Sequence, residues 1–127
     1  MITNDWFDEI SAIALTESIP VSDEFGGLTF QIEADGIEVT IHVNKFERFI
    51  SLRLRRVGSL ASLIELEIPR CSGVRIVQQE RNSAFVFFPP FEPDEISRSC
   101  TCIIGAVTLT IRPSPSVTFN RQINTGT

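Results

Sequence analysis

The stretch covering residues 28–43 constrains the fold most strongly. Apolar residues occupy every second position on both sides of Asp35 and Gly36. This alternation is typical of strands with one buried face, and Asp-Gly supplies the two positive-φ residues of a type I′ turn. Because such a turn fixes the register of a hairpin, we expect Ile32 to lie opposite Val39.

A third strand follows the hairpin. Residues 49–55 alternate again, with Ile50, Leu52 and Leu54 on one side. These side chains match the core side of the hairpin, so the pattern predicts a three-stranded antiparallel meander over residues 28–56.

The solvent side of this meander is predicted to carry a charge ladder. The hairpin turn places Glu33 opposite Glu38, an unfavourable pair of like charges. If the core faces of the second and third strands match, Arg55 lies opposite Glu38 and Arg53 lies opposite Thr40. We therefore expect Arg55 to offset the repulsion.

The N-terminal residues predict an amphipathic helix over 4–18. Asn4 and Asp5 can cap it, and its expected apolar stripe contains Trp6, Ile10 and Ile13. Ile19-Pro20 would end it, because the residue before proline is driven out of the α region. We expect this helix to cover a face of the sheet.

The rest of the chain leaves the fold class open between two architectures. Residues 59–68 favour a short helix capped by Ser59, but a strand with Ile64, Leu66 and Ile68 inward fits them nearly as well. The other expected elements are a strand pair over 74–88, a helix over 93–104, a strand over 106–111 and a surface tail over 112–127. Together they predict a single α+β domain, in which the N-terminal helix packs on the meander. The alternative is a mostly-β sandwich.

Composition indicates a globular protein of the cytoplasm. The chain of 127 residues contains no apolar run near the roughly 18 residues that span a bilayer. Acidic residues stand at the N-terminus where a signal peptide would carry lysine or arginine. The three cysteines, Cys71, Cys100 and Cys102, suit neither a closed disulfide set nor a tetrahedral metal site, so we expect free thiols and no metal.

Charge is divided unevenly along the chain. The net charge is −5, but residues 1–47 hold ten acids and one base (−9), while residues 48–127 hold six acids and ten arginines (+4). We expect the two parts to pair with each other within the fold, with a binding surface as the alternative.

No catalytic motif or cofactor fingerprint is present in the sequence. His42 is the single histidine, and the hairpin register places it on the solvent side opposite Thr29. No nucleophile is evident beside it, so we expect no catalytic residue and no cofactor. The acidic charge opposes nucleic-acid binding by the arginines. A small ligand-binding domain or enzyme that uses His42 and arginines remains an alternative, and it would require a polar pocket around His42.

Two apolar segments are candidate binding surfaces. Residues 84–88 are apolar on both faces of the expected strand, so this strand is expected either to be central and covered on both faces or to form part of an interface. The candidate partner-binding or dimer residues are Leu60, Leu63, Phe85, Val86, Phe87 and Phe88. A homodimer would cover the outward face.

The order of expected elements resembles that of the small acidic class I chaperones of type III secretion systems. The resemblance depends on Trp6-Phe7-Asp8-Glu9-Ile10, on Ile19-Pro20 and on the hairpin that begins at Leu28. It implies a homodimeric, non-enzymatic protein that holds an extended segment of a secreted partner. Edge strands and apolar patches are suited to capturing such a segment. An all-β structural or assembly subunit is the alternative from a different class.

Overall fold

The computed structural model describes residues 6–79, 81–88 and 106–119, in which one helix precedes nine strands. The helix α1 spans Glu9–Thr16. The strands are β1 (Val21–Ser22), β2 (Gly27–Ala34), β3 (Ile37–Asn44), β4 (Phe49–Arg56), β5 (Ser62–Ile68), β6 (Gly73–Gln78), β7 (Ser83–Phe88), β8 (Val107–Arg112) and β9 (Ser116–Phe119). The helix is not long enough to span a membrane, and no other helix occurs among these residues.

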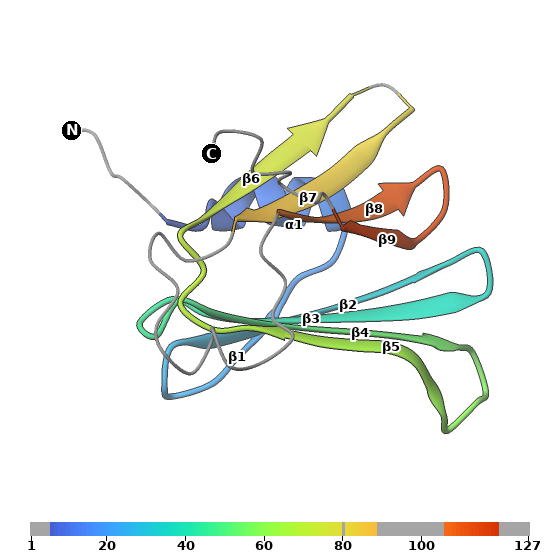
Figure 1. The fold of residues 1–127 in the computed structure, drawn as a ribbon, viewed down its shortest axis with the longest axis horizontal. Coiled ribbons are helices and arrows are strands. Elements are labelled where there is room, and N and C mark those ends of the chain that lie inside the picture. Colours follow the sequence, from blue (N-terminus) through green and yellow to red (C-terminus); the bar gives the residue numbers. More distant parts are fainter. Residues whose placement is uncertain (1–5, 80, 89–105, 120–127) are drawn as a thin grey trace, which may run out of the picture.

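The strands form two antiparallel sheets that lie face to face (Figure 1). The first sheet has the order β1-β2-β3-β4-β5, and the second has the order β6-β7-β8-β9. Neighbouring strands in each sheet are consecutive in the chain, so both sheets are meanders. The prediction of an α+β fold is therefore wrong, and the described chain is mostly β, with two layers as in the sandwich alternative.

The predicted meander over 28–56 is confirmed by the pairing of β2, β3 and β4. Asp35 and Gly36 have φ values of 55° and 74°, as a type I′ turn requires. Ile32 pairs with Val39 in the hairpin, and the core faces of β3 and β4 also match in the predicted register. Local turn chemistry and the period of two were sufficient to specify this part of the fold.

Residues 59–68, for which a short helix was favoured, contain the strand β5 instead. Ile64, Leu66 and Ile68 pair with core residues of β4, and this pairing outweighs the helix propensity of the neighbouring Leu, Ala and Glu residues. The register shifts at Leu63, which is the extra residue of a β-bulge.

Helix α1 is shorter than predicted, and its buried face differs in part from the prediction. Its N-cap is Asp8, whose side chain accepts a hydrogen bond from the Ser11 backbone N–H, and it ends at Thr16, before Glu17 adopts a left-handed conformation. The predicted stripe is right in part: Trp6 and Ile13 pack against the core, but Ile10 is 81% exposed. The residues that the helix buries are Ala12, Leu15 and Thr16. The predicted caps Asn4 and Asp5 lie outside the described residues.

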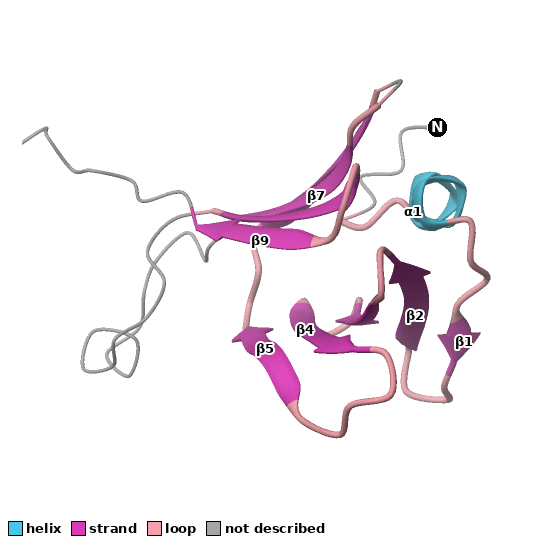
Figure 2. Cartoon of the chain, turned by 90° about the vertical axis from the view of Figure 1, so that its right-hand side faces the viewer, coloured by secondary structure: helices cyan, strands magenta, loops and turns pink. Residues whose placement is uncertain are grey.

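Helix α1 lies beside β6 in the layer of the second sheet, over the β1–β2 end of the first sheet (Figure 1). Figure 2 shows α1 beside β1 and β2, away from β5. Trp6, just before the helix, donates a hydrogen bond from Nε1 to the carbonyl oxygen of Cys71, at 2.7 Å. Arg112 contacts Glu17 at 2.9 Å, so the end of the helix is also tied to β8.

Strand β7 is a central strand with two different faces. Phe85 and Phe87 are fully buried between the sheets, with ring centroids 5.9 Å apart, whereas Val86 is half-buried and Phe88 is 37% exposed on the outer face. The chain after β7 returns as the predicted strand β8, and the predicted tail over 112–127 contains β9. The predicted helix over 93–104 lies outside the described residues.

The adjacent residues Phe87 and Phe88 allow a direct test of this arrangement. We expect Phe87→Ala to lower the free energy of unfolding by about 3–5 kcal/mol, because it leaves a cavity between the sheets. The matched variant Phe88→Ala should cost only about 1 kcal/mol, because its ring is partly in solvent. Urea denaturation of both variants measures the difference, and equal losses would contradict the assignment of the two faces.

Candidate functional site

The outer face of the first sheet is the most regular polar surface in the described structure. Alternate residues of β2 to β5 point away from the core and form rows across the four strands. We call this surface the polar face and define it by Thr29, Gln31, Glu33, Glu38, Thr40, His42, Ser51, Arg53, Arg55, Glu65 and Glu67.

The predicted charge ladder has the expected register. Glu33 lies opposite Glu38, and Arg55 lies opposite Glu38 on the other side. Arg55 Nη2 is 2.9 Å from Glu38 Oε1, and both side chains are mostly shielded, at 33% and 25% exposure. The guanidinium therefore offsets the repulsion between the two glutamates.

The next row continues onto β5, where the sequence prediction did not extend. Arg53 lies opposite Thr40 on one side and Glu65 on the other, with Arg53 Nε 3.3 Å from Glu65 Oε1. The Ser62 hydroxyl donates a hydrogen bond to the same carboxylate oxygen, at 3.0 Å. Alternation of the apolar residues of β5 was the signal that could have placed Glu65 and Glu67 on this face.

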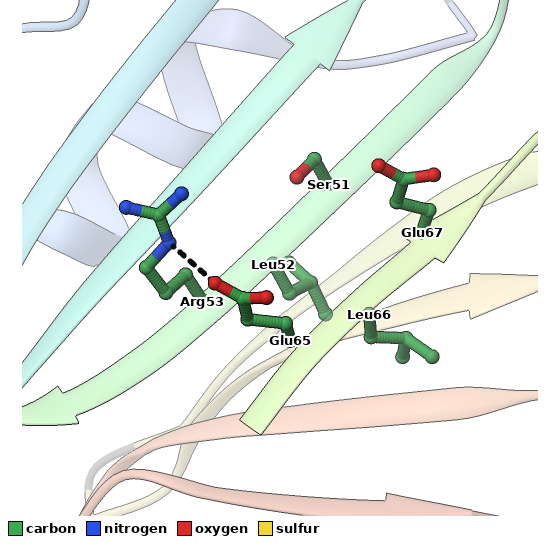
Figure 3. Close-up of a pocket in the computed structure, with 6 residues that line it drawn as sticks. All are labelled: Ser51, Leu52, Arg53, Glu65, Leu66 and Glu67. Atoms are coloured by element: carbon green, nitrogen blue, oxygen red, sulfur yellow. Dashed lines mark ion pairs between the residues drawn. The ribbon is translucent and has the colours of Figure 1, made fainter. Parts of the chain in front are cut away.

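A hollow of about 290 Å³ lies between β4 and β5 (Figure 3). It is lined by Ser51, Leu52, Arg53, Glu65, Leu66 and Glu67. The Arg53–Glu65 ion pair crosses one part of it, whereas Glu67 has no ion-pair partner among the described residues. The lining supplies carboxylate and hydroxyl acceptors, which suit a cationic or hydrogen-bond-donating group better than an anion.

His42 belongs to a hydrogen-bonded cluster at the β1 end of the polar face, and it does not line the hollow. Its Nδ1 is 3.0 Å from the hydroxyl of Thr29, the residue opposite in the hairpin. Gly27 packs against this ring and leaves no room for a side chain. A Cβ at this position would lie 2.9 Å from His42 Cε1 and would also contact Asp23. This packing explains why glycine occupies the start of β2.

Asp23 fixes the loop before β2. Its Oδ1 accepts hydrogen bonds from the backbone N–H groups of Gly27 and Phe25, both at 2.8 Å. These bonds, and to a smaller degree the nearby His42, lower the pKa of the Asp23 carboxyl. The cluster of Asp23, Gly27, Thr29 and His42 therefore has a structural explanation that requires no catalysis.

The predicted apolar binding residues do not form one surface. Leu60 is 96% exposed in the β4–β5 loop, and Leu63 is 54% exposed at the bulge of β5. Val86 and Phe88 lie on the outer face of the second sheet, which faces away from the first sheet. Phe85 and Phe87 are buried in the core, so they are not accessible to a partner, and the predicted homodimer stays a prediction.

The cysteine predictions can be followed only at Cys71. Its thiol is buried and donates a hydrogen bond to the Gly73 carbonyl at 3.1 Å, and burial raises the pKa of the Cys71 thiol. Cys100 and Cys102 lie outside the described residues. Within residues 6–79, 81–88 and 106–119, no three metal-ligating side chains come together.

The divided charge of the sequence is partly paired within the fold. Two ion pairs join the arginine-rich residues 48–127 to the acidic residues 1–47, namely Arg55–Glu38 and Arg112–Glu17. The ion pair Arg53–Glu65 lies within the arginine-rich part instead.

Comparison with known proteins identifies a shared fold but no family. No family model matches the chain, and no curated protein matches it significantly. Among solved structures, it is similar to a chain of a contact-dependent growth inhibition toxin–immunity protein complex from Klebsiella pneumoniae 342. The TM-score is 0.69 at 16% identity, and the match covers 88% of this chain and 91% of the other.

The two ion pairs of the polar face should differ in strength. In double-mutant cycles with glutamine replacements, we expect Glu38 and Arg55 to couple by about 0.5–1 kcal/mol, and Glu65 and Arg53 by about 0.5 kcal/mol or less, because the second pair is longer and more exposed. Urea denaturation at low and high salt measures both couplings. A larger coupling for Glu65 and Arg53 would contradict the geometry.

Proposed function

We propose that this chain is a non-enzymatic protein that binds another protein through the polar face, in the manner of one member of a toxin–immunity pair. The observation that carries the proposal is the preorganised charge pattern of this face. Arg55 is held by Glu38 at 2.9 Å in a mostly shielded pair, so the position of this charge is set before a partner arrives. Arg53 lies 3.3 Å from Glu65 in a more exposed pair beside it. Fixed charges on a rigid sheet favour specific recognition and fast association.

The net negative charge of the polar face supports a partner whose contacting surface is basic. The polar face carries the carboxylates of Glu33, Glu38, Glu65 and Glu67 against the guanidinium groups of Arg53 and Arg55, which leaves an excess of two negative charges. The whole chain has the same sign, at −5. A negative field of this kind would steer a basic protein toward the chain and would repel nucleic acid.

The structural neighbour supports the same class of function. The similar chain belongs to a complex of a toxin with its immunity protein, so a fold similar to this one occurs in a complex of two proteins. A protein that inhibits by binding needs a stable surface complementary to its partner, and it needs no catalytic residues of its own. The structural role of His42 in the cluster with Thr29 and Asp23 agrees with that requirement.

The secretion-chaperone hypothesis would also make this a protein-binding chain, but with different stoichiometry. It requires a homodimer that holds an extended segment of its partner. The element order that motivated it included a helix within residues 59–68, where the structure has β5. Light scattering would distinguish the proposals, because the toxin–immunity proposal expects one copy of this chain per partner.

Matched substitutions on opposite sheets test the proposed surface. Thr40 is half-buried at the centre of the polar face, and Thr108 is half-buried on the outer face of the second sheet. We expect Thr40→Arg to weaken binding to a partner purified with the wild-type chain by at least about tenfold, because it adds bulk and positive charge at the centre of the contact. Thr108→Arg should leave the affinity unchanged.

Isothermal titration calorimetry on folded variants measures these affinities. Loss of binding with Thr108→Arg alone would place the interface on the other sheet. A wild-type chain that retains no protein from its source cells, even after cross-linking, would contradict the proposed function itself.

A further inference from the structure

We propose that the outer edge of β5 accepts an extended segment of the partner as a sixth strand, and that this segment alternates apolar and basic residues. This inference rests on the proposed function, because it names the part of the partner that would be recognised.

The two edges of the first sheet differ in length. At one edge, β1 has only two residues, and α1 lies beside it (Figure 2). At the other edge, β5 has seven residues, and no strand among residues 6–79, 81–88 and 106–119 pairs with its outer side. The outward backbone N–H and C=O groups of such an edge can pair with another chain.

The inward side chains of β5 are incompletely covered. Ile64 and Leu66 pack against the core but are only half-buried, whereas their partners on β4, Leu54 and Leu52, are buried. An additional strand would place its own inward side chains beside Ile64 and Leu66 and remove apolar surface from water. The inward positions of the added segment should therefore be apolar.

The outward side chains of β5 determine the sign of charge on the added segment. Glu65 and Glu67 point to the polar face, where residues on a sixth strand would lie directly beside them. Opposite charges across neighbouring strands are favourable, and like charges are unfavourable. Lysine or arginine at every second position would satisfy Glu67, which has no ion-pair partner among the described residues, and would share Glu65 with Arg53.

Two local features limit the length of the added pairing. The bulge at Leu63 interrupts regular strand geometry at one end, and Pro69 follows β5 at the other. These leave Ile64–Ile68 as the segment with regular edge geometry. Leu63 in the bulge and Leu60 beyond it are both exposed and would border the added strand without pairing to it.

The direct probe is a labelled, acetylated seven-residue peptide of alternating valine and lysine. We expect fluorescence anisotropy to detect its binding to the wild-type chain, and Glu67→Lys to weaken that binding at least about fivefold, because it reverses the charge beside the peptide. The matched control Glu24→Lys makes the same change outside the polar face, in the loop between β1 and β2. It should leave the affinity within about twofold, since β1 and β2 are separated from β5 by β3 and β4.

Backbone methylation separates strand addition from simple attraction between charges. One peptide carries N-methyl groups on its valines and another carries them on its lysines. Because only alternate N–H groups of an added strand point toward β5, one of the two methylated peptides should lose binding and the other should retain it. Equal affinity of all three peptides, or no peptide binding to the wild-type chain, would overturn the inference.

The same variants distinguish this inference from the proposed function. If the purified partner binds the wild-type chain, loses affinity for Thr40→Arg and binds Glu67→Lys normally, then the polar face is the interface but the edge of β5 is not. If the peptide binds as expected but no partner protein is retained, the edge is functional as a strand acceptor and the proposed function is wrong.

Discussion

The contact on which the rest of the structure depends is the packing of Phe7 against both sheets. Its ring centroid lies 5.9 Å from that of Phe30 on β2 and 6.5 Å from that of Phe85 on β7. All three side chains are almost fully buried. Large aromatic rings contribute strongly to core packing. The segment before α1 therefore joins the two layers, and Trp6 reinforces this connection through its hydrogen bond to Cys71.

Once these layers are joined, the alternation of each strand decides which side chains face solvent. The apolar residues of the first sheet are buried between the two sheets, among them Phe30, Val39, Ile41 and Leu52. The intervening residues of the same strands must therefore form the polar face. The charge pattern is thus a consequence of the core rather than an independent feature. A one-residue shift between β3 and β4 would bury Arg53 and Arg55 and expose Leu52 and Leu54, which makes such a shift strongly unfavourable.

The sequence was informative where structure is determined locally and less so where distant segments decide it. Asp35-Gly36 and the period of two predicted β2, β3, β4 and the Glu38–Arg55 contact. Residues 62–68 were ambiguous because their composition suits a helix, and their strand conformation depends on pairing with β4. For the same reason, Glu65, Glu67 and the hollow beside them were missed. The buried face of α1 was predicted only in part, because it depends on how the helix fits beside β6 and over the first sheet.

The proposed binding surface combines two kinds of recognition. The polar face offers fixed charges on a central part of the sheet, and β5 offers backbone groups beside half-buried Ile64 and Leu66. Charge determines partner selectivity and association rate, while strand pairing and apolar burial prolong the complex. The asymmetric placement of α1 makes this arrangement possible, because the helix lies over the β1–β2 end of the first sheet, away from β5.

Hydrogen–deuterium exchange of the free chain and of its complex shows whether a partner protein binds the first sheet and extends it at β5. We expect exchange to slow at backbone amides within Ile64–Ile68 when the partner binds, and β6 to β9 to change little. Slowed exchange confined to the second sheet, or a complex with no change in β5, would contradict this mode of binding.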